Sequence, residues 1–376
     1  MSARAPASAV TAAATTRRDG AMRRDSAMRR DGATRRRGVA LLVAFALLVA
    51  VVLAGVCIGA IALPVGNVVS SLLSRIGIQV GTRLPYLQEQ ILFSWRVPRV
   101  LLAALVGGVL ALAGASYQGV FRNPLADPYL LGAAAGAGLG ATVVIGYAPQ
   151  GVGPLGTVPA AAFVGALSGV GLAYGLGSLA SRSGGGSGGS ATLLLSGVAV
   201  ASFLTAAQTL VQQAHSDDLR QVYSWILGQL GNAQWDQLVM VLPYAAISVA
   251  VLLASGRALD VLAVGDDEAS MLGVRPRRIR LIVLLAASLG TAAAVAVSGL
   301  IGFVGLVVPH IVRRLAGGSY RTVLPVSLLG GAAFLVAADL VARTVLAPAE
   351  LPIGVVTAFV GAPFFAALLR VGGGQA

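Results

Sequence analysis

The chain contains several long segments that are apolar and uncharged, and these constrain its fold more than any other feature. The clearest runs from Val100 to Phe121, with Arg96 and Arg99 before it and Arg122 after it. A helix of about 20 apolar residues crosses the hydrocarbon core of a bilayer. The segment is rich in glycine and alanine, which is typical of membrane helices that pack closely. It therefore predicts a membrane-spanning helix.

Composition places the whole chain in the same class. Only 11% of the 376 residues are charged and 57% are hydrophobic, whereas a soluble domain is about a quarter charged. The net charge of +13 would suit nucleic acid, but the arginines lie in the first 38 residues and between the apolar segments. No aromatic and basic module accompanies them, which excludes nucleic acid as a partner. Arginine-rich loops are instead typical of the cytoplasmic side of a membrane.

We predict an all-α integral membrane protein with about ten transmembrane helices within residues 39–371. The uncharged stretch 281–312 is too long for one helix, and small residues from Ser298 to Gly305 divide it into a seventh helix and a short eighth. The others are expected at 39–63, 100–121, 129–148, 158–179, 191–211, 238–255, 323–345 and 352–369, with a short surface helix at 68–73. An even number places both termini on one side, and the arginines make that side cytoplasmic.

Three segments lie outside this pattern. Residues 1–38 repeat an arginine-rich unit without an apolar face and predict a disordered basic tail. An arginine pair before an apolar run also occurs in export signals. The apolar run at 39–63 that follows the tail is longer than such a signal and lacks a cleavage site. Residues 181–190 predict a flexible connector, because a phosphate loop needs a lysine and the chain has none. Residues 215–235 predict an interfacial segment with Trp225 and Trp235 at headgroup level.

Arg96, Arg99 and Arg343 fall at the outer ends of predicted helices. An arginine at a helix end can anchor it by extending its side chain to water. Three such groups can also form a platform for the carboxylates of a soluble partner. Arg343 follows Asp339 by four residues, so one helical turn can pair them. Both interpretations stay open on the sequence.

The longest charged interruption after the tail spans residues 257–280. Within it, three acids from Asp266 to Glu268 suit the N-terminus of a short helix, and Gly273 can end that helix. A helix here has no bilayer to pack against, so it is either part of a solvated loop or a docking element for another subunit.

A rigid corner is predicted after the helix at 100–121. Pro124 and Pro128 exclude regular helix there. Asn123 and Asp127 can accept hydrogen bonds from backbone groups that the turn frees. Arg122 opens this corner.

No catalytic or metal site is predicted. His310 follows Pro309, and with one other histidine and no nearby cysteine a ligand role is unsupported. Cys57 is alone, so neither a disulfide nor a cysteine cluster can form within one chain. Glu350 can cap backbone amides at the start of the last helix or line a pathway. Nucleophile, metal and nucleotide motifs are missing, so we expect a protein that is not an enzyme and binds no cofactor.

Five segments together resemble the FecCD family, the permease subunits of ATP-binding-cassette importers for ferric siderophores, haem and cobalamin. They are residues 96–132, 224–230, 264–274, 299–317 and 350–365, in the family's order. The resemblance implies the type II importer permease fold, with an inverted pseudo-repeat between two groups of helices. It also implies a homodimer whose pathway follows the two-fold axis, in the bacterial cytoplasmic membrane.

The same resemblance implies two ATPase subunits, which bind ATP and Mg²⁺, and an extracytoplasmic substrate-binding protein. It assigns binding-protein docking to Arg96, Arg99 and Arg343, and a cytoplasmic gate to Ser190, Ala191 and Thr192. It assigns ATPase coupling to a run of nine residues: Gly265, Asp266, Asp267, Glu268, Ala269, Ser270, Met271, Leu272 and Gly273.

The expected substrate is a metal chelate, namely a ferric siderophore complex, with cobalamin or haem as alternatives. A secondary transporter driven by an ion gradient is the alternative of another class. It would need acids along a pathway, and Asp127 is the only acid between Val100 and Val211.

Overall fold

The computed structural model describes residues 35–59, 61–147, 154–183 and 189–372. Within these ranges the regular elements are helices, and no strand occurs. The N-terminal helix spans Arg35–Cys57. It is followed by α2 (Val65–Arg75), α3 (Tyr86–Gln90), a π-helical turn (Ile91–Arg96), α4 (Val97–Phe121), α5 (Ala133–Tyr147), α6 (Pro154–Ser183), α7 (Gly189–Ala214), a 3-10 turn (Ser216–Asp218), α8 (Leu219–Ile226), α9 (Trp235–Ala254), α10 (Gly256–Val264), α11 (Asp266–Met271), α12 (Pro276–Ser298), α13 (Val304–Ala316), α14 (Tyr320–Thr344) and α15 (Ile353–Gly372).

Each predicted membrane helix corresponds to a helix of the structure. Seven of the described helices are long and apolar enough to cross a membrane. Helices α5 and α15 supply two shorter apolar ones, and α13 is the short helix expected after the break at residues 299–303. The predicted surface helix is α2. The all-α membrane fold is confirmed, and the inverted pseudo-repeat stays a prediction.

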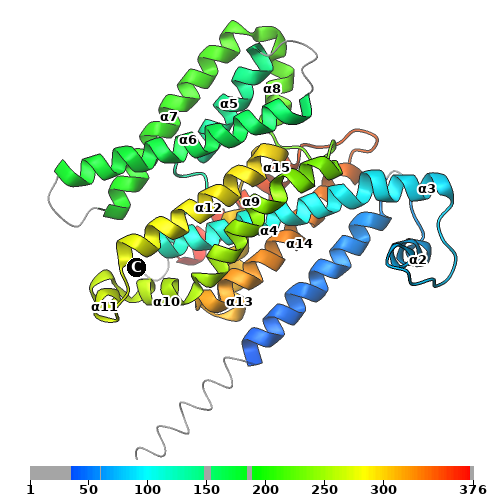
Figure 1. Ribbon diagram of the computed structural model, residues 1–376, viewed down its shortest axis with the longest axis horizontal. Helices are drawn as coiled ribbons and strands as arrows, with labels where there is room; N and C mark the ends of the chain where they lie inside the picture. Colours follow the sequence, from blue (N-terminus) through cyan, green and yellow to red (C-terminus); the bar gives the residue numbers. More distant parts are fainter. Residues whose placement is uncertain (1–34, 60, 148–153, 184–188, 373–376) are drawn as a thin grey trace, which may run out of the picture.

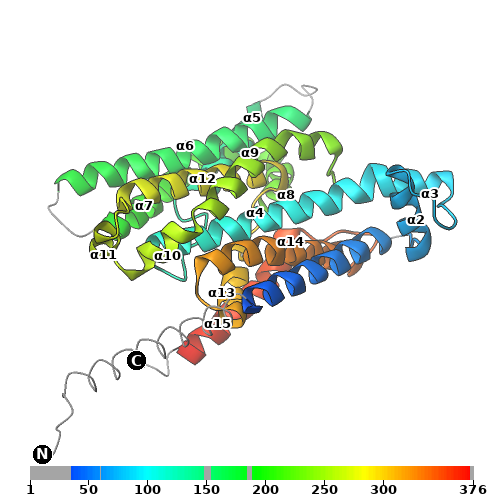
Figure 2. The same ribbon diagram turned by 60° about the horizontal axis from the view of Figure 1, so that its bottom comes forward.

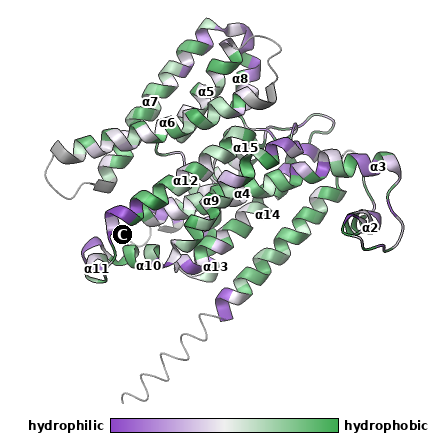
Figure 3. Ribbon diagram, in the orientation of Figure 1, coloured by the Kyte–Doolittle hydropathy of each residue, from purple (hydrophilic) through white to green (hydrophobic). Residues whose placement is uncertain are grey.

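The helices form an elongated bundle with two distinct ends, and α5, α6 and α7 lie along one side of it (Figures 1 and 2). One end carries α2, α3 and the start of α4, and we call it the α3 end. The opposite end carries α10 and α11, with the start of the N-terminal helix and the end of α15, and we call it the α11 end. Hydrophilic residues gather at the two ends, and the helices between the ends are mostly hydrophobic (Figure 3). This distribution is expected of a bundle surrounded by a bilayer.

Helix α4 is the centre of the bundle, and every residue from Val106 to Phe121 is buried. Two of its glycines allow neighbouring backbones to come close. A Cβ atom on Gly107 would overlap the carbonyl oxygen of Gly331 in α14, and one on Gly114 would overlap the backbone of Gly305 in α13. Membrane helices associate through such close packing, because lipid is as apolar as their side chains.

The helix that contains α4 begins earlier than the sequence predicts. Residues Tyr86–Phe121 form one continuous helical segment of 36 residues, with a π-helical turn at Ile91–Arg96. Pro98 lacks the N–H that would bond the carbonyl four residues before it. Prolines and π-helical turns are both common where a long helix departs from regular α-helical geometry. The segment just before residue 100, where the sequence predicts no membrane helix, is therefore helical from Tyr86 onward.

One further prediction is corrected. Residues 35–38 of the predicted tail belong to the N-terminal helix, because arginine favours helix and can extend from a helix end to water. The headgroup-level position of Trp225 stays a prediction; the residue is 8% exposed, and its backbone packs directly against Gly299. Residues 1–34 of the tail and 184–188 of the connector lie outside the described residues.

Replacing Gly107 by valine is expected to destabilise the protein, because the added atoms would overlap the backbone of Gly331. Overpacking of this kind costs about 1–3 kcal/mol or more, so the purified variant should unfold at a clearly lower temperature. The matched control is Gly171→Val in α6, where a Cβ would meet nothing within 4 Å. Equal losses of stability in the two variants would contradict the close contact of α4 with α14.

Candidate functional site

Two of the three predicted docking arginines hold the end of the N-terminal helix. The last carbonyls of a helix have no partner within it, and Arg96 donates to those of Val56 and Cys57, both at 2.9 Å. Arg343 donates to the carbonyl of Gly55 in the same turn. A cation at this position also complements the negative end of the helix dipole. Both side chains are buried.

The third arginine, Arg99, binds two carboxylates at the α3 end. Its distance to Asp339 in α14 is 2.9 Å, and its distance to Glu350, just before α15, is 2.8 Å. Arg343 also lies 3.6 Å from Asp339, one turn away as predicted. Asp339 is 1% exposed, whereas Glu350 is 44% exposed. Arg99 and Glu350 therefore connect a buried charge cluster to the surface of the α3 end.

The predicted docking groups are thus brought together, but each already has a partner within the chain. Arg96 and Arg343 bind backbone carbonyls, and only Arg99 shares a carboxylate that is open to solvent. The hydrogen bond from Arg99 to Glu350 holds the pKa of the Glu350 carboxyl below its usual value. The Glu350 carboxylate therefore stays ionised at neutral pH and is open to solvent, whereas the Arg99 side chain beneath it is 12% exposed.

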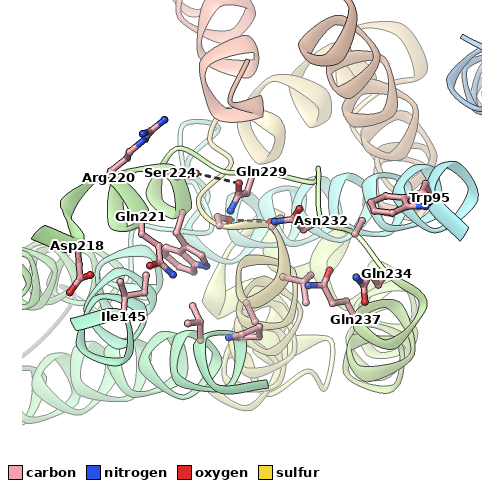
Figure 4. Close-up of a pocket in the computed structure, with 18 of the residues that line it drawn as sticks. Trp95, Ile145, Asp218, Arg220, Gln221, Ser224, Gln229, Asn232, Gln234 and Gln237 are labelled. Carbon is pink, nitrogen blue, oxygen red and sulfur yellow. Dashed lines mark hydrogen bonds between the residues drawn. The ribbon is translucent and has the colours of Figure 1, made fainter. Parts of the chain in front are cut away.

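A cavity of about 800 Å³ is lined by α8, the start of α9, the end of α12 and the adjoining ends of α5 and α6. It lies beside the charge cluster, because Gln229 lines both this cavity and a smaller one that contains Arg99 and Glu350. Figure 4 shows its polar side chains arranged around the opening. Five of them are carboxamides, which can both donate and accept hydrogen bonds, and Trp95 and Trp225 provide aromatic surface. The carboxamides are Gln221, Gln229, Asn232, Gln234 and Gln237.

The sequence analysis does not predict this cavity. The signal was present, because the five carboxamides fall between residues 221 and 237. What the sequence did not reveal is that this segment packs back onto the bundle. The main chain of Gln229 donates to the carbonyl of Ser298 at 2.9 Å, which places α8 and its loop against the end of α12.

At the α11 end, the predicted acidic helix forms and ends where expected. Helix α11 begins with three acids and stops before Gly273, whose φ of +79° favours glycine. Gly273 donates to Ser270 and Val274 donates to Ala269, each at 3.0 Å, which is the Schellman pattern of helix termination. Met271 is 85% exposed and Leu272 is 68% exposed, so α11 presents apolar side chains beside its acids.

The predicted corner is tied directly to this helix. Asp266 in α11 accepts from Arg122 of the corner and from Arg280 at the start of α12, the latter at 2.7 Å. Arg122 has a φ of +50°, which is costly for a residue other than glycine. Such a conformation persists when surrounding contacts hold it, and the ion pair with Asp266 is one of them.

The remaining corner residues behave as predicted. The Asn123 and Asp127 side chains accept from the main-chain N–H groups of Leu125 and Tyr129, both at 2.9 Å. Pro128 lies next to Gly305, where an added Cβ would stand 2.8 Å from its ring. Pro124, in contrast, is exposed. The corner therefore connects α11 with α13 and the core.

The other predicted residues lie apart from these contacts. Ser190, Ala191 and Thr192 form the first turns of α7, where Ala191 is exposed and the Ser190 side chain lies outside the described ones. Pro309 is buried within α13. The His310 ring meets the Phe364 ring edge-on at 5.9 Å, which is a packing contact.

The FecCD transport family matches residues 47–371, nearly all of the predicted membrane domain. This chain belongs to the FecCD transport family. It is 43% identical over 287 residues to the cobalamin import system permease of Halobacterium salinarum, covering 76% of this chain and 75% of that protein. It is 42% identical over 273 residues to the hemin transport system permease of Yersinia pestis, covering 72% of this chain and 80% of that protein.

The fold agrees with that assignment. A solved inward-facing metal-chelate type ABC transporter matches the FecCD chain with a TM-score of 0.76 and 29% identity, over 88% of this chain and 98% of that one. The predicted family is thus confirmed, and the protein is a transport protein rather than an enzyme. The two permeases named above carry different cargoes by name, so family membership leaves the cargo undetermined.

The pairing of Glu350 with Arg99 predicts a pH dependence of stability. The pKa of Glu350 is lower in the folded protein than its ordinary value of 4.5. The ionised carboxylate therefore stabilises the fold fully above pH 4.5, and this stabilisation is lost as the pH falls through the folded-state pKa. Melting temperatures of wild type and Glu350→Gln should therefore differ at about pH 7 and converge near the folded pKa. Glu268→Gln, an exposed acid with no ion pair among the described residues, is the control; a constant difference for Glu350→Gln would contradict the pairing.

Proposed function

We propose that this chain is the membrane-spanning permease subunit of an ATP-binding-cassette importer and that its cargo is a ferric siderophore complex. The observation that carries the importer assignment is α11, a short helix outside the bundle that is linked by Asp266 to Arg122 and Arg280. The FecCD match over residues 47–371 supports it independently.

In this proposal α11 is the element that couples the permease to an ATPase. Its exposed Met271 and Leu272 would enter an apolar recess of that partner, since large exposed apolar groups outside a bilayer mark interaction sites. The partner binds ATP and Mg²⁺, and this chain contributes no nucleotide site. A displacement of α11 would be transmitted through the Asp266 carboxylate to Arg122 and the end of α4. Of the candidate membrane spans in the described residues, the one that contains α4 is the most buried.

The α3 end is the proposed docking face for a substrate-binding protein. Arg99 supplies the reachable charge, since Glu350 beside it is open to solvent. A carboxylate of the binding protein would replace Glu350 on Arg99. Arg96 and Arg343 would take part by holding the N-terminal helix in place under that face.

The cavity of carboxamides and tryptophans supports the cargo proposal. In a ferric siderophore the iron is already bound by the chelator's own oxygens, so the protein meets amides, hydroxamates and hydroxyls. Side-chain carboxamides bond such groups in either direction, and the cavity of about 800 Å³ is within the usual size range of ligand sites. Cobalamin and haem are the alternative cargoes, by analogy with the named relatives.

The assembly we propose is a homodimer with two ATPase subunits and one binding protein in the bacterial cytoplasmic membrane. The α11 end and both termini face the cytoplasm. Arginines gather at that end, as the positive-inside rule requires. Ser190, Ala191 and Thr192 at the start of α7 are the proposed cytoplasmic gate.

Reconstituted transport tests the proposal. Vesicles that hold the permease, its ATPase and its binding protein should take up a ferric hydroxamate only with ATP, and should ignore an imposed ion gradient. Asp266→Asn should reduce uptake roughly tenfold, as expected when about 1.4 kcal/mol of coupling is lost, while the subunits still assemble. Asp236→Asn, an exposed acid in the first turn of α9, is the control.

Uptake driven by an ion gradient would instead favour a secondary transporter. That alternative needs a titrating acid within the bundle, whereas buried Asp339 is held by two arginines. Uptake of cobalamin or haem with rejection of the ferric hydroxamate would keep the importer but overturn the cargo assignment.

The docking proposal predicts that substitutions of Arg99 and of Glu350 change the affinity for the binding protein in opposite directions. Arg99→Gln should weaken binding of the substrate-binding protein, whereas Glu350→Gln should strengthen it about threefold, because it removes an internal competitor worth less than about 1 kcal/mol. Binding is measured with the permease in lipid nanodiscs. If both variants weakened binding equally, the Arg99–Glu350 pair would be structural only and the docking role of Arg99 would be rejected.

A further inference from the structure

A second cavity lies at the α11 end, away from the contacts of Asp266. It has a volume of about 400 Å³ and is bounded by the N-terminal helix, the α9–α10 junction and the start of α14. Three of its six lining residues are arginines, and each comes from a different element: Arg37, Arg257 and Arg321. The other three are Leu253, Ala254 and Pro325. The cavity thus combines a cationic rim with an apolar wall.

These three charges have no counter-ion within the described part of the chain. None of the ion pairs there includes Arg37, Arg257 or Arg321. Asp260 lies one turn along α10 from Arg257, but it accepts from the Ser319 hydroxyl at 2.8 Å and from the Tyr320 N–H at 2.6 Å. Its carboxylate therefore serves the start of α14, and no acid lines the cavity.

Backbone packing brings the arginines together. Gly256 opens α10, and a Cβ atom there would stand 3.4 Å from the Cα of Arg321. The starts of α10 and α14 are therefore in close contact, which fixes Arg257 and Arg321 side by side. Three cations held close together repel one another, and an anion between them removes that cost.

We propose that this cavity binds the phosphate of an anionic phospholipid headgroup. Arginine recognises phosphate through several N–H donors in a fixed plane, and basic pockets between membrane helices on the cytoplasmic side suit anionic headgroups. A lipid fits better than a soluble phosphate because Leu253, which lines the cavity, is itself exposed on the apolar surface of α9. An acyl chain can follow that surface while the headgroup meets the arginines.

A bound lipid would join the N-terminal helix to α10 and α14. Helix α10 leads directly into α11, so the lipid would steady the element that we propose contacts the ATPase. The choice of the cytoplasmic leaflet rests on the proposed orientation, whereas the chemistry of the cavity does not.

Native mass spectrometry of the purified full-length chain tests this proposal, with phosphatidylglycerol, zwitterionic phosphatidylethanolamine and inorganic phosphate as probes. Wild type should bind phosphatidylglycerol about tenfold more tightly than phosphatidylethanolamine, because the three arginines attract the net negative charge of its headgroup. The variant with Arg37→Gln, Arg257→Gln and Arg321→Gln should lose that preference. The matched control replaces three exposed arginines outside the cavity, Arg277, Arg278 and Arg314, and should keep it.

Three results would overturn the proposal. They are equal binding of the two lipids by wild type, equal loss of preference in both triple variants, and displacement of phosphatidylglycerol by millimolar inorganic phosphate. The last would identify a soluble anion as the ligand. The wild-type comparison does not depend on whether a variant folds, and lipid binding is measured without transport, so failure here is separate from failure of the importer assignment.

Discussion

The structure depends most on the pairing of charge inside an apolar bundle. Asp339 is almost fully buried, and an unpaired carboxylate there would cost several kcal/mol. It is held by Arg99 and Arg343, and these two extend the network outward, to Glu350 and to the end of the N-terminal helix. Removing one partner would leave a buried charge, so the cluster fixes four separate segments at the α3 end.

The rest of the bundle is organised by contact between backbones rather than by large side chains. Gly107 and Gly114 let α4 touch α14 and α13, and α4 is buried from Val106 to Phe121. A helix held this closely can pass on a displacement with little loss, because packed interiors deform little. The ion pair of Arg122 with Asp266 joins the end of α4 to α11. The rigid core and the exposed α11 are thus linked directly by this ion pair.

Local features were predictable from the sequence. The uncharged segments, the two prolines of the corner and the three acids before Gly273 each act on residues within one or two turns, so helices, corner and α11 appear near their predicted positions. Asn123, Asp127 and the Asp339–Arg343 turn also behave as expected. The start of the helix at Tyr86 was missed, because a π-helical turn leaves no clear periodic signal.

The sequence by itself determined the class of protein, the order of its helices and the residues that carry charge at each end. Only the tertiary structure decided what those charges bind. The partners of Arg99 lie 240 and 251 positions away in the chain, and Arg96 binds carbonyl groups that every residue possesses and no side-chain pattern marks. In the same way, the segment that holds five carboxamides became a cavity wall only by packing onto α12. Arg37, Arg257 and Arg321 became one basic site only when folding brought their three helices together.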